Sequence, residues 1–293
     1  MAVSDGADPA GLIGRALDAA DSARLVALSS EAGWNQIEAD WRLLLSLGGG
    51  WGFFTADGAP VASALILPYG AFGWISMVLV TRDWRRRGLA TQLVRRSIDA
   101  LVERGAVAML DATDDGRQAY RPLGFRDLWS FTRLSLDKPQ RRGPPPIDIE
   151  GVIIRAMTPA DLDAVGAFEA EAFGAPRPGV YADLLRRRPK QALIAKRAGK
   201  LSGFVLARDG RLALQLGPVV AETPVLAAGL VARALAQLDQ RVIIDAVDAQ
   251  GAFWRWLTST GFMPRRRFTR MSLDGASFGR PALLFAVAGP ELG

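Results

Sequence analysis

The chain has 293 residues, of which 49% are hydrophobic and 23% are charged, so it predicts a folded globular protein of two domains. It contains no cysteine and no histidine, which excludes disulfides, Cys or His metal sites, thiol nucleophiles and histidine acid–base catalysis. The net charge of +6 favours anionic ligands such as phosphates, but it is too small to indicate a nucleic acid partner.

The start of the chain is acidic, unlike a secretory signal. One uncharged stretch, residues 62–80, approaches the length of a membrane span. Pro68, Gly70 and Gly73 divide it into two runs of strand length. We therefore expect a cytoplasmic protein with no membrane partner.

The first half of the chain alternates helical and strand patterns. Apolar residues three and four positions apart predict helices, and short apolar runs between turn residues predict strands. The predicted helices are residues 20–30, 36–47, 89–104 and 115–123, and the predicted strands are residues 51–55, 61–67, 74–80, 107–110 and 131–136. This order predicts an α/β (α+β) unit with a mixed central sheet flanked by helices.

Two blocks of sequence recur in the second half of the chain. The segments 124–137 and 261–274 share eight of fourteen residues at an offset of 137. The segment 13–21 resembles 153–161 at an offset of 140. The chain is therefore interpreted as a duplicated unit, with domains at 1–137 and 151–293 and a Pro-rich linker at 138–150.

A short basic loop joins an apolar strand to a helix in the first copy. Three consecutive arginines precede Gly88, and Ala90 follows in the first turn of the helix. The first turn of a helix offers free N–H groups and the positive end of the helix dipole, and a glycine lets a ligand approach the backbone. The pattern indicates a site for a pyrophosphate, although arginines in such a loop can also be merely solvated.

Two motifs of the first copy resemble those of the GCN5-related N-acetyltransferases (GNAT). Arg85-x-x-Gly88-x-Ala90 is similar to the family's coenzyme A pyrophosphate motif, and Tyr120-x-x-x-Gly124-Phe125 to its terminal signature. The resemblance implies a tandem GNAT protein that uses acetyl-CoA as a co-substrate and no metal. It also implies cofactor contacts, with the pantetheine arm and then the pyrophosphate, at Val78, Leu79, Val80, Arg85, Arg86, Arg87, Gly88, Leu89, Ala90 and Thr91.

The resemblance also implies a catalytic role for Tyr120. Acyl transfer from a thioester releases a thiolate that needs a proton, and a phenol can supply it. Tyr120 stands where the family places its general acid. The alternative is a tyrosine of the core that only packs.

Candidates for the general base are Glu31, Asp40, Asp111 and Asp115, or a chain of water molecules. Asp111 ends a short strand and could face the thioester, or it could cap the turn that follows. The resemblance places an acceptor pocket near Trp34 and Asn35. The alternative is a turn between helices in which Asn35 is an N-cap.

The second copy lacks both motifs. Its segment 220–229 keeps a helix start at Thr223 and Pro224 but no arginine-glycine loop, and Glu222 adds negative charge. Leu257 stands where the first copy has Tyr120. We expect this copy to be non-catalytic.

The sequence thus predicts an acetyl-CoA-dependent N-acetyltransferase, active in its first domain on a small amine or a peptide amino group. One alternative is an acyl-CoA-binding pseudoenzyme or scaffold. Another is a transferase that uses aminoacyl-tRNA, for which a strong dependence of RNA binding on salt would be the sign. The sequence does not indicate the acceptor or the oligomeric state.

Overall fold

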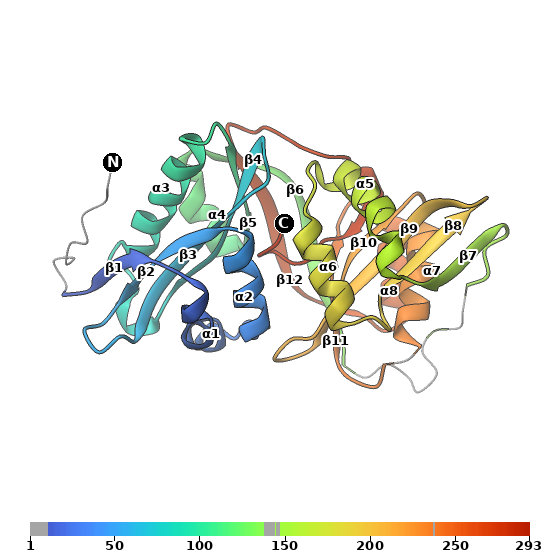
Figure 1. Ribbon diagram of the computed structural model, residues 1–293, viewed down its shortest axis with the longest axis horizontal. Helices are drawn as coiled ribbons and strands as arrows, with labels where there is room; N and C mark the ends of the chain where they lie inside the picture. The colour runs from blue at the N-terminus through green and yellow to red at the C-terminus, as the bar shows by residue number, and fades with distance from the viewer. Residues whose placement is uncertain (1–10, 138–143, 145–146, 237) are drawn as a thin grey trace. The chain divides into compact units, whose positions relative to one another are not determined.

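The computed structural model describes residues 11–137, 144, 147–236 and 238–293. It divides into two compact units, each a sheet with helices (Figure 1). Unit 1 runs to Leu110 and includes Leu292, and unit 2 comprises Asp111 to Glu291 with Gly293. Most of the expected linker, 138–150, lies outside the described residues, and the domain boundaries of the duplication stay a prediction.

Unit 1 is built around five strands. Its elements are β1 (Ile13–Ala16), η1 (Ala19–Asp21), α1 (Ser22–Glu31), α2 (Glu38–Leu47), β2 (Gly49–Phe54), β3 (Pro60–Pro68), β4 (Phe72–Val80), η2 (Arg82–Trp84), α3 (Leu89–Val102) and β5 (Val107–Ala112), whose last two residues belong to unit 2.

These strands lie in the order β1-β2-β3-β4-β5. All neighbours are antiparallel except β4 and β5, which are parallel. Helix α3 packs on β3 and β4, and its buried Leu89 and Leu93 join the core residues Phe53 and Val61. The strands stay close enough to exclude a side chain at Gly50, whose Cβ would lie 2.2 Å from the Ala64 carbonyl oxygen.

Unit 2 holds the remaining elements. They are α4 (Asp114–Tyr120), η3 (Arg121–Leu123), β6 (Phe125–Leu136), β7 (Val152–Ala156), η4 (Pro159–Asp161), α5 (Leu162–Phe173), α6 (Pro178–Arg187), β8 (Leu193–Arg197), β9 (Lys200–Arg208), β10 (Leu214–Ala221), α7 (Pro224–Leu235), β11 (Val242–Val247), α8 (Gly251–Ser259), β12 (Met263–Leu273), η5 (Pro281–Leu283) and β13 (Leu284–Ala286).

The strands of unit 2 follow the order β12-β6-β11-β13-β10-β9-β8-β7. Strand β6 comes from the first sequence repeat, yet it lies between two strands of the second. Its Arg133 is opposite Asp245 of β11, and its Phe131 is opposite Phe268 of β12. Because of this pairing, the end of the first repeat folds as part of the compact unit that contains the second.

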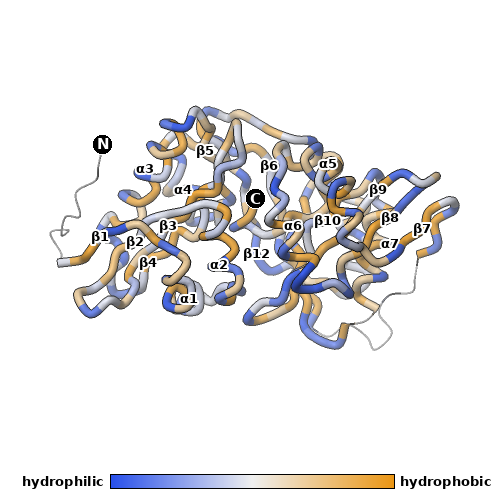
Figure 2. Tube along the Cα trace, in the orientation of Figure 1, coloured by the Kyte–Doolittle hydropathy of each residue, from blue (hydrophilic) through white to orange (hydrophobic). Residues whose placement is uncertain are grey.

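Hydrophobic residues recur along the strands and helices of each unit, as Figure 2 shows in orange. In unit 2 a large core lies between α7, α8 and the sheet, and it includes the fully buried Leu230, Phe253 and Leu257. Among the described residues, no helix combines the length and the hydropathy that crossing a membrane would require.

The predicted α/β class with mixed sheets and flanking helices is confirmed. The helices and strands expected between residues 20 and 123 are present with small shifts at their ends. Two strand segments were not predicted: β1, and the first half of β6 before Phe131. Both have mixed exposure along the strand, so their sequences lack the apolar run that identifies a buried strand.

The first duplicated block forms the same ion pair in both copies. Arg15 donates to both carboxylate oxygens of Asp21 at 2.8 and 2.7 Å, and Arg155 does the same to Asp161 at 2.8 and 2.6 Å. Each aspartate also accepts from a backbone N–H at the start of its short helix. These contacts explain why the arginine and the aspartate recur six residues apart.

We predict that Asp21→Asn lowers the free energy of unfolding by about 1–2 kcal/mol at pH 7. The Arg15 guanidinium holds the pKa of Asp21 below its usual value of 3.8. A carboxylate with a lowered pKa stabilises the folded state above that usual value and loses this effect as the pH falls. The difference in unfolding free energy between wild type and variant, from urea titrations at pH 7 to 3, should therefore shrink toward acid.

Asp163→Asn, on the exposed surface of α5, is the control and should change the unfolding free energy by less than about 0.5 kcal/mol. A difference for Asp21→Asn that does not depend on pH would contradict the role assigned to its ion pair.

Candidate functional site

Strand β4 carries a bulge, and beyond Trp74 one of its edges has no strand partner among the described residues of unit 1. Ser76 lies opposite Leu65 and Leu79 opposite Ser63, so two residues of β4 oppose one of β3. Met77, in this bulge, has a φ of 50°, and its carbonyl accepts a hydrogen bond of 2.7 Å from Ser63 Oγ. A bulge of this kind redirects the backbone groups that follow it.

The pairing between β4 and β5 ends at Trp74 and Met109. The later part of β4 contains the three residues assigned to the pantetheine arm, Val78, Leu79 and Val80, and β3 is the strand that it pairs with in unit 1. Backbone groups on the other edge of this segment are therefore placed to bind an extended ligand in the manner of an added strand.

The loop after β4 is shaped by two of its arginines. Arg85 Nε donates to the carbonyl of Val80 at 3.1 Å, and Arg87 lies over the ring of Trp84, 4.6 Å from its centroid. Arg86 is exposed, has a φ of 62°, and has no ion-pair partner among the described residues. All three arginines are exposed, so this loop presents positive charge to solvent.

Helix α3 begins without a side-chain cap. Its N-cap is Gly88, with a φ of 82°, and the first helical hydrogen bond runs from Gln92 N to Gly88 O. The N–H groups of Leu89, Ala90 and Thr91 precede that bond and have no partner within the helix. Together with the helix dipole, they form a site that favours an anion.

Open space adjoins this helix start. A Cβ built on Gly88 would have nothing within 4 Å. A cavity of about 610 Å³ lies beside it, lined by Gly88, Thr91, Gln92, Arg95, Arg96 and Asp99. Of these, Gln92, Arg95 and Arg96 were not expected from the sequence. Gln92 lies four residues after Gly88, and Arg95 and Arg96 lie three and four residues after Gln92, so all three lie on one helix face.

Tyr120 is the last residue of α4, which Thr113 caps by accepting from Gly116 N at 3.2 Å. Its half-buried ring packs on Gly116 and lies 6.0 Å from the ring of Phe125. Burial raises the pKa of Tyr120 to about 12. The phenol therefore keeps its proton through the physiological range of pH, as a proton donor must.

The side chain of Asp111 is buried and paired. Its two oxygens accept from Nε and Nη2 of Arg270, each at 3.0 Å, and its side chain is 0% exposed. Burial raises the pKa of Asp111, and the adjacent guanidinium opposes that shift. The turn after β5 is capped by Thr113, so the alternative of Asp111 as the cap does not apply.

The other candidate bases lie in different surroundings. Glu31, at the exposed end of α1, accepts a 2.7 Å hydrogen bond from the N–H of Arg82, in the loop after β4. Asp40 is buried and accepts from Ile37 N at 2.9 Å, at the start of α2. Asp115 is exposed in the first turn of α4. Glu31 is therefore the candidate that directly contacts the loop of the anion site.

The expected acceptor residues lie between α1 and α2. Trp34 is half-buried, and its N–H donates to Ser29 O at 2.8 Å. Asn35 is 2% exposed. The N-cap of α2 is Ile37, so Asn35 does not cap this helix.

The second repeat has a matching pair of parallel strands, but the edge between them is occupied by another strand. Strands β10 and β11 pair from Leu214 to Leu216 and then separate, as β4 and β5 do. Strand β13 lies in the gap, with Ala286 opposite both Val219 of β10 and Ala246 of β11. The edge that corresponds to the unpaired edge of β4 is thus already hydrogen-bonded to protein.

The start of α7 is closed in the same way. Thr223 accepts from Leu226 N at 3.3 Å through its side chain, and Pro224 at the first helical position has no N–H. Leu257, at the position of Tyr120, is 0% exposed in the core. The donors that make the first site attractive to an anion are absent or satisfied in the second.

Comparison with known proteins identifies the family to which both repeats belong. Residues 18–125 match the model of the Acetyltransferase (GNAT) family, and residues 165–283 match that of the Acetyltransferase (GNAT) domain. The chain therefore belongs to the GNAT acetyltransferases and contains two GNAT domains.

Two curated relatives extend over most of the chain. The uncharacterized N-acetyltransferase YitH of Bacillus subtilis (strain 168) is 25% identical, over 81% of this chain and 83% of its own length. The holothin acyltransferase of Pseudoalteromonas sp. (strain SANK 73390) is 26% identical, over 80% of this chain and 78% of its own length.

Solved structures share the fold. A putative acetyltransferase from Pyrococcus horikoshii superposes with a TM-score of 0.78, 21% identity and 99% of each chain covered. A tandem GNAT protein from the clavulanic acid biosynthesis pathway superposes with a TM-score of 0.66 and 17% identity, over 89% of this chain and 98% of its own.

We predict that Gly88→Ala weakens the binding of inorganic pyrophosphate about tenfold. An alanine is strained at a φ of 82°, so the turn would shift and the N–H groups of the first turn would no longer converge. Isothermal titration calorimetry measures the affinity.

Gly105→Ala is the matched control, since Gly105 follows the other end of α3, has a φ of 68° and also has open space around its Cβ. It carries a similar strain but should leave the affinity unchanged. Equal losses in the two variants would show that the helix start is not the anion site.

Proposed function

We propose that this protein is an acetyl-CoA-dependent N-acetyltransferase whose active site belongs to the first GNAT domain. The observation that carries the proposal is the difference between the two repeats. In the first, the helix start at Gly88 has no side-chain cap and the pairing of β4 with β5 ends at Trp74, whereas in the second Thr223 caps the matching helix and β13 pairs with the matching strand.

Acetyl-CoA fits the features of the first repeat. Its pyrophosphate needs several N–H donors and positive charge, which the first turn of α3 and Arg86 supply. Its pantetheine arm carries amide groups, which can pair with the edge of β4 at Val78 and Val80, where the ligand would share or replace the contact of Arg85 with the Val80 carbonyl. The positive charge of the loop is opposite in sign to the negative charge of the phosphates.

The reaction transfers the acetyl group from sulfur to nitrogen. A neutral amine attacks the thioester carbonyl, a C–N bond forms and the C–S bond breaks. Tyr120 donates its phenolic proton to the departing thiolate, and the amine loses a proton to solvent or to a carboxylate. With a pKa of about 12, Tyr120 carries at neutral pH the proton that this step requires.

The acceptor is proposed to be a small amine or a peptide amino group. The name of the relative from Pseudoalteromonas supports acyl transfer as the reaction class. Trp34 and Asn35 are proposed to contribute to the acceptor pocket, and the cytoplasmic location stays a prediction.

Calorimetry with acetyl-CoA tests the cofactor and its location. We expect one binding site per chain, and loss of binding when Arg86, Arg87 and Gly88 are replaced together by Glu, Glu and Ala. Two sites per chain would overturn the assignment to the first domain. Absence of binding in the wild type would overturn the proposal and favour an acyl-CoA-independent role.

We predict that Tyr120→Phe lowers kcat at least about 100-fold and changes the Kd for acetyl-CoA less than twofold, because it removes only the transferable proton. Release of CoA can be followed directly with a thiol reagent, since the protein has no cysteine to react. Hydroxylamine is a suitable first acceptor because it is neutral at pH 7.

Tyr181→Phe is the control. Tyr181 is a buried tyrosine of α6, and its hydroxyl packs against Gly166 in the second repeat. It should leave kcat unchanged. A loss of acetyl-CoA affinity without a specific loss of turnover in Tyr120→Phe would show that Tyr120 packs but does not donate.

The pKa of Tyr120 also predicts the pH dependence. A donor with a pKa near 12 stays protonated until the pH rises toward that value, so deprotonation of Tyr120 should not reduce kcat below about pH 10. With hydroxylamine, whose amine is already neutral, kcat should be flat from pH 7.5 to 10. A fall centred near pH 8 or 9 would identify a different proton donor.

A further inference from the structure

Two buried ion pairs occupy equivalent places in the duplicated sequence. Arg133 and Arg270 belong to the same repeated segment, Thr-Arg-x-Ser, at the offset of 137. Arg133 donates to both oxygens of Asp245 at 2.8 Å, and Arg270 donates to both oxygens of Asp111 at 3.0 Å. Both aspartates have side chains that are 0% exposed.

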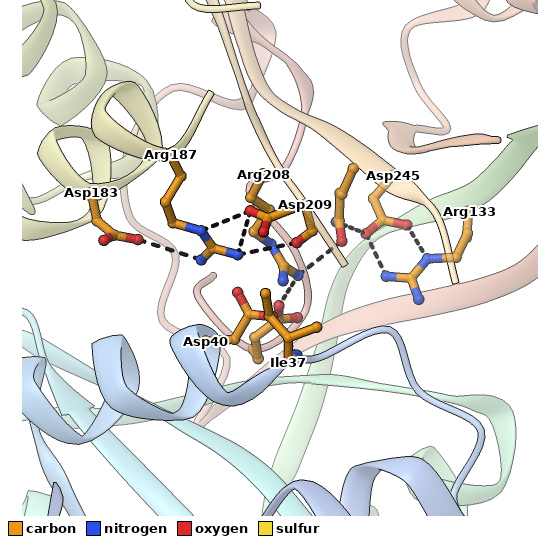
Figure 3. Close-up of polar contacts among 10 residues, drawn as sticks. Ile37, Asp40, Arg133, Asp183, Arg187, Arg208, Asp209 and Asp245 are labelled. Carbon is orange, nitrogen blue, oxygen red and sulfur yellow. Dashed lines mark hydrogen bonds and ion pairs between the residues drawn. The ribbon is translucent and has the colours of Figure 1, made fainter. Parts of the chain in front are cut away.

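Other polar groups surround the pair of the second repeat. Gln215 Nε2 donates to Asp245 Oδ2 at 2.8 Å, and Gln215 Oε1 accepts from Arg208 at 2.9 Å. Figure 3 shows Arg133, Asp245 and Arg208 in this part of unit 2. Arg208 in turn pairs with Glu291. Asp245 is therefore one member of a buried network.

The pair of the first repeat stands at the start of the helix that carries Tyr120. Asp111 lies two residues before Thr113, the cap of α4. Asp245 has no such position, because it lies five residues before Gln250, the N-cap of α8. A single residue, Ala112, therefore separates the ion pair of Asp111 from the cap of α4.

Strand β12 of the second repeat contacts the chain both before and after this helix. Arg270, from β12, binds Asp111 before α4, and its guanidinium lies 4.2 Å from the ring centroid of Trp129. After the helix, the space at Gly124 is limited by Leu273 of β12, whose Cδ1 would be 3.2 Å from an added Cβ. The first repeat contributes Tyr120, and the second repeat contributes the strand that fixes its helix.

We propose that Arg270 and Asp111 are positioning residues, through which the non-catalytic repeat fixes the helix of Tyr120 for proton donation. The proposal rests on the function proposed above for Tyr120. It assigns Asp111 to the support of α4 in place of a role as general base, because both its oxygens bind Arg270 in the buried interior. It also gives the second repeat a part in catalysis without a cofactor of its own.

The two ion pairs provide their own control. Arg270→Lys and Arg133→Lys each keep a positive charge but replace a two-pronged contact by a point charge. Both should lower Tm, since each pair is buried. Only Arg270→Lys should lower kcat, by about 10- to 100-fold with hydroxylamine as acceptor, while the Kd for acetyl-CoA changes less than twofold.

A double variant separates positioning from general destabilisation. If Arg270 acts through the phenol, Arg270→Lys should reduce kcat further by less than twofold when Tyr120 is already Phe. Independent, multiplicative losses would overturn the proposal, and so would equal losses of kcat in the two lysine variants.

A spectroscopic readout does not depend on turnover. The chain has three tyrosines, Tyr69, Tyr120 and Tyr181, so 3-fluorotyrosine labelling should give three ¹⁹F resonances that Tyr→Phe variants assign. Arg270→Lys should shift or broaden the resonance of Tyr120, and Arg133→Lys should not. An unchanged Tyr120 resonance in a folded Arg270→Lys protein would overturn the proposal.

Asp111→Asn and Asp245→Asn form a second matched pair if a lysine variant does not fold. The same pattern is expected, with loss of kcat and a changed Tyr120 resonance only for Asp111→Asn. If Tyr120→Phe leaves kcat unchanged, the proposed role of Tyr120 as proton donor fails. If the Tyr120 resonance still changes only in the Arg270 and Asp111 variants, the structural contact between this ion pair and α4 is nevertheless supported.

Discussion

The pairing of β6 between β11 and β12 is the constraint on which the rest of unit 2 depends. A buried arginine–carboxylate pair is tolerated only with good geometry, because both charges lose their hydration. Arg133 of β6 meets this condition with Asp245 of the neighbouring β11, and Arg270 of β12 meets it with Asp111. This arrangement places the end of the first repeat in the compact unit of the second.

The two GNAT domains share one framework but differ at the start of the matching helix and along the matching strand edge. Stability favours satisfied backbone groups, and the second repeat satisfies them with the Thr223 side chain and with β13. A ligand site needs groups that are left unsatisfied until the ligand arrives. In the first repeat, the helix start at Gly88 has no side-chain cap, and the pairing of β4 with β5 ends at Trp74.

The parts of the site that could be predicted from sequence are those formed by neighbouring residues. The loop Arg85–Ala90 and the helix start at Gly88 are local, so their spacing alone indicated an anion site, and the structure has the expected backbone there. The partner of Asp111 could not be predicted, because Arg270 is 159 residues away and reaches it only through β12. The same holds for β13, whose three residues carry no pattern that specifies the gap they occupy.

The sequence by itself determined the fold class, the duplication and the family, because hydrophobic periodicity, repeated blocks and contiguous motifs are properties of the chain read in order. It also determined that acid–base chemistry proceeds without histidine or cysteine. Only the tertiary structure decided which strands exchange between repeats, which helix start stays open and which aspartate is neutralised by an arginine. These outcomes depend on strand register and burial, which join residues far apart in sequence and which no local pattern specifies.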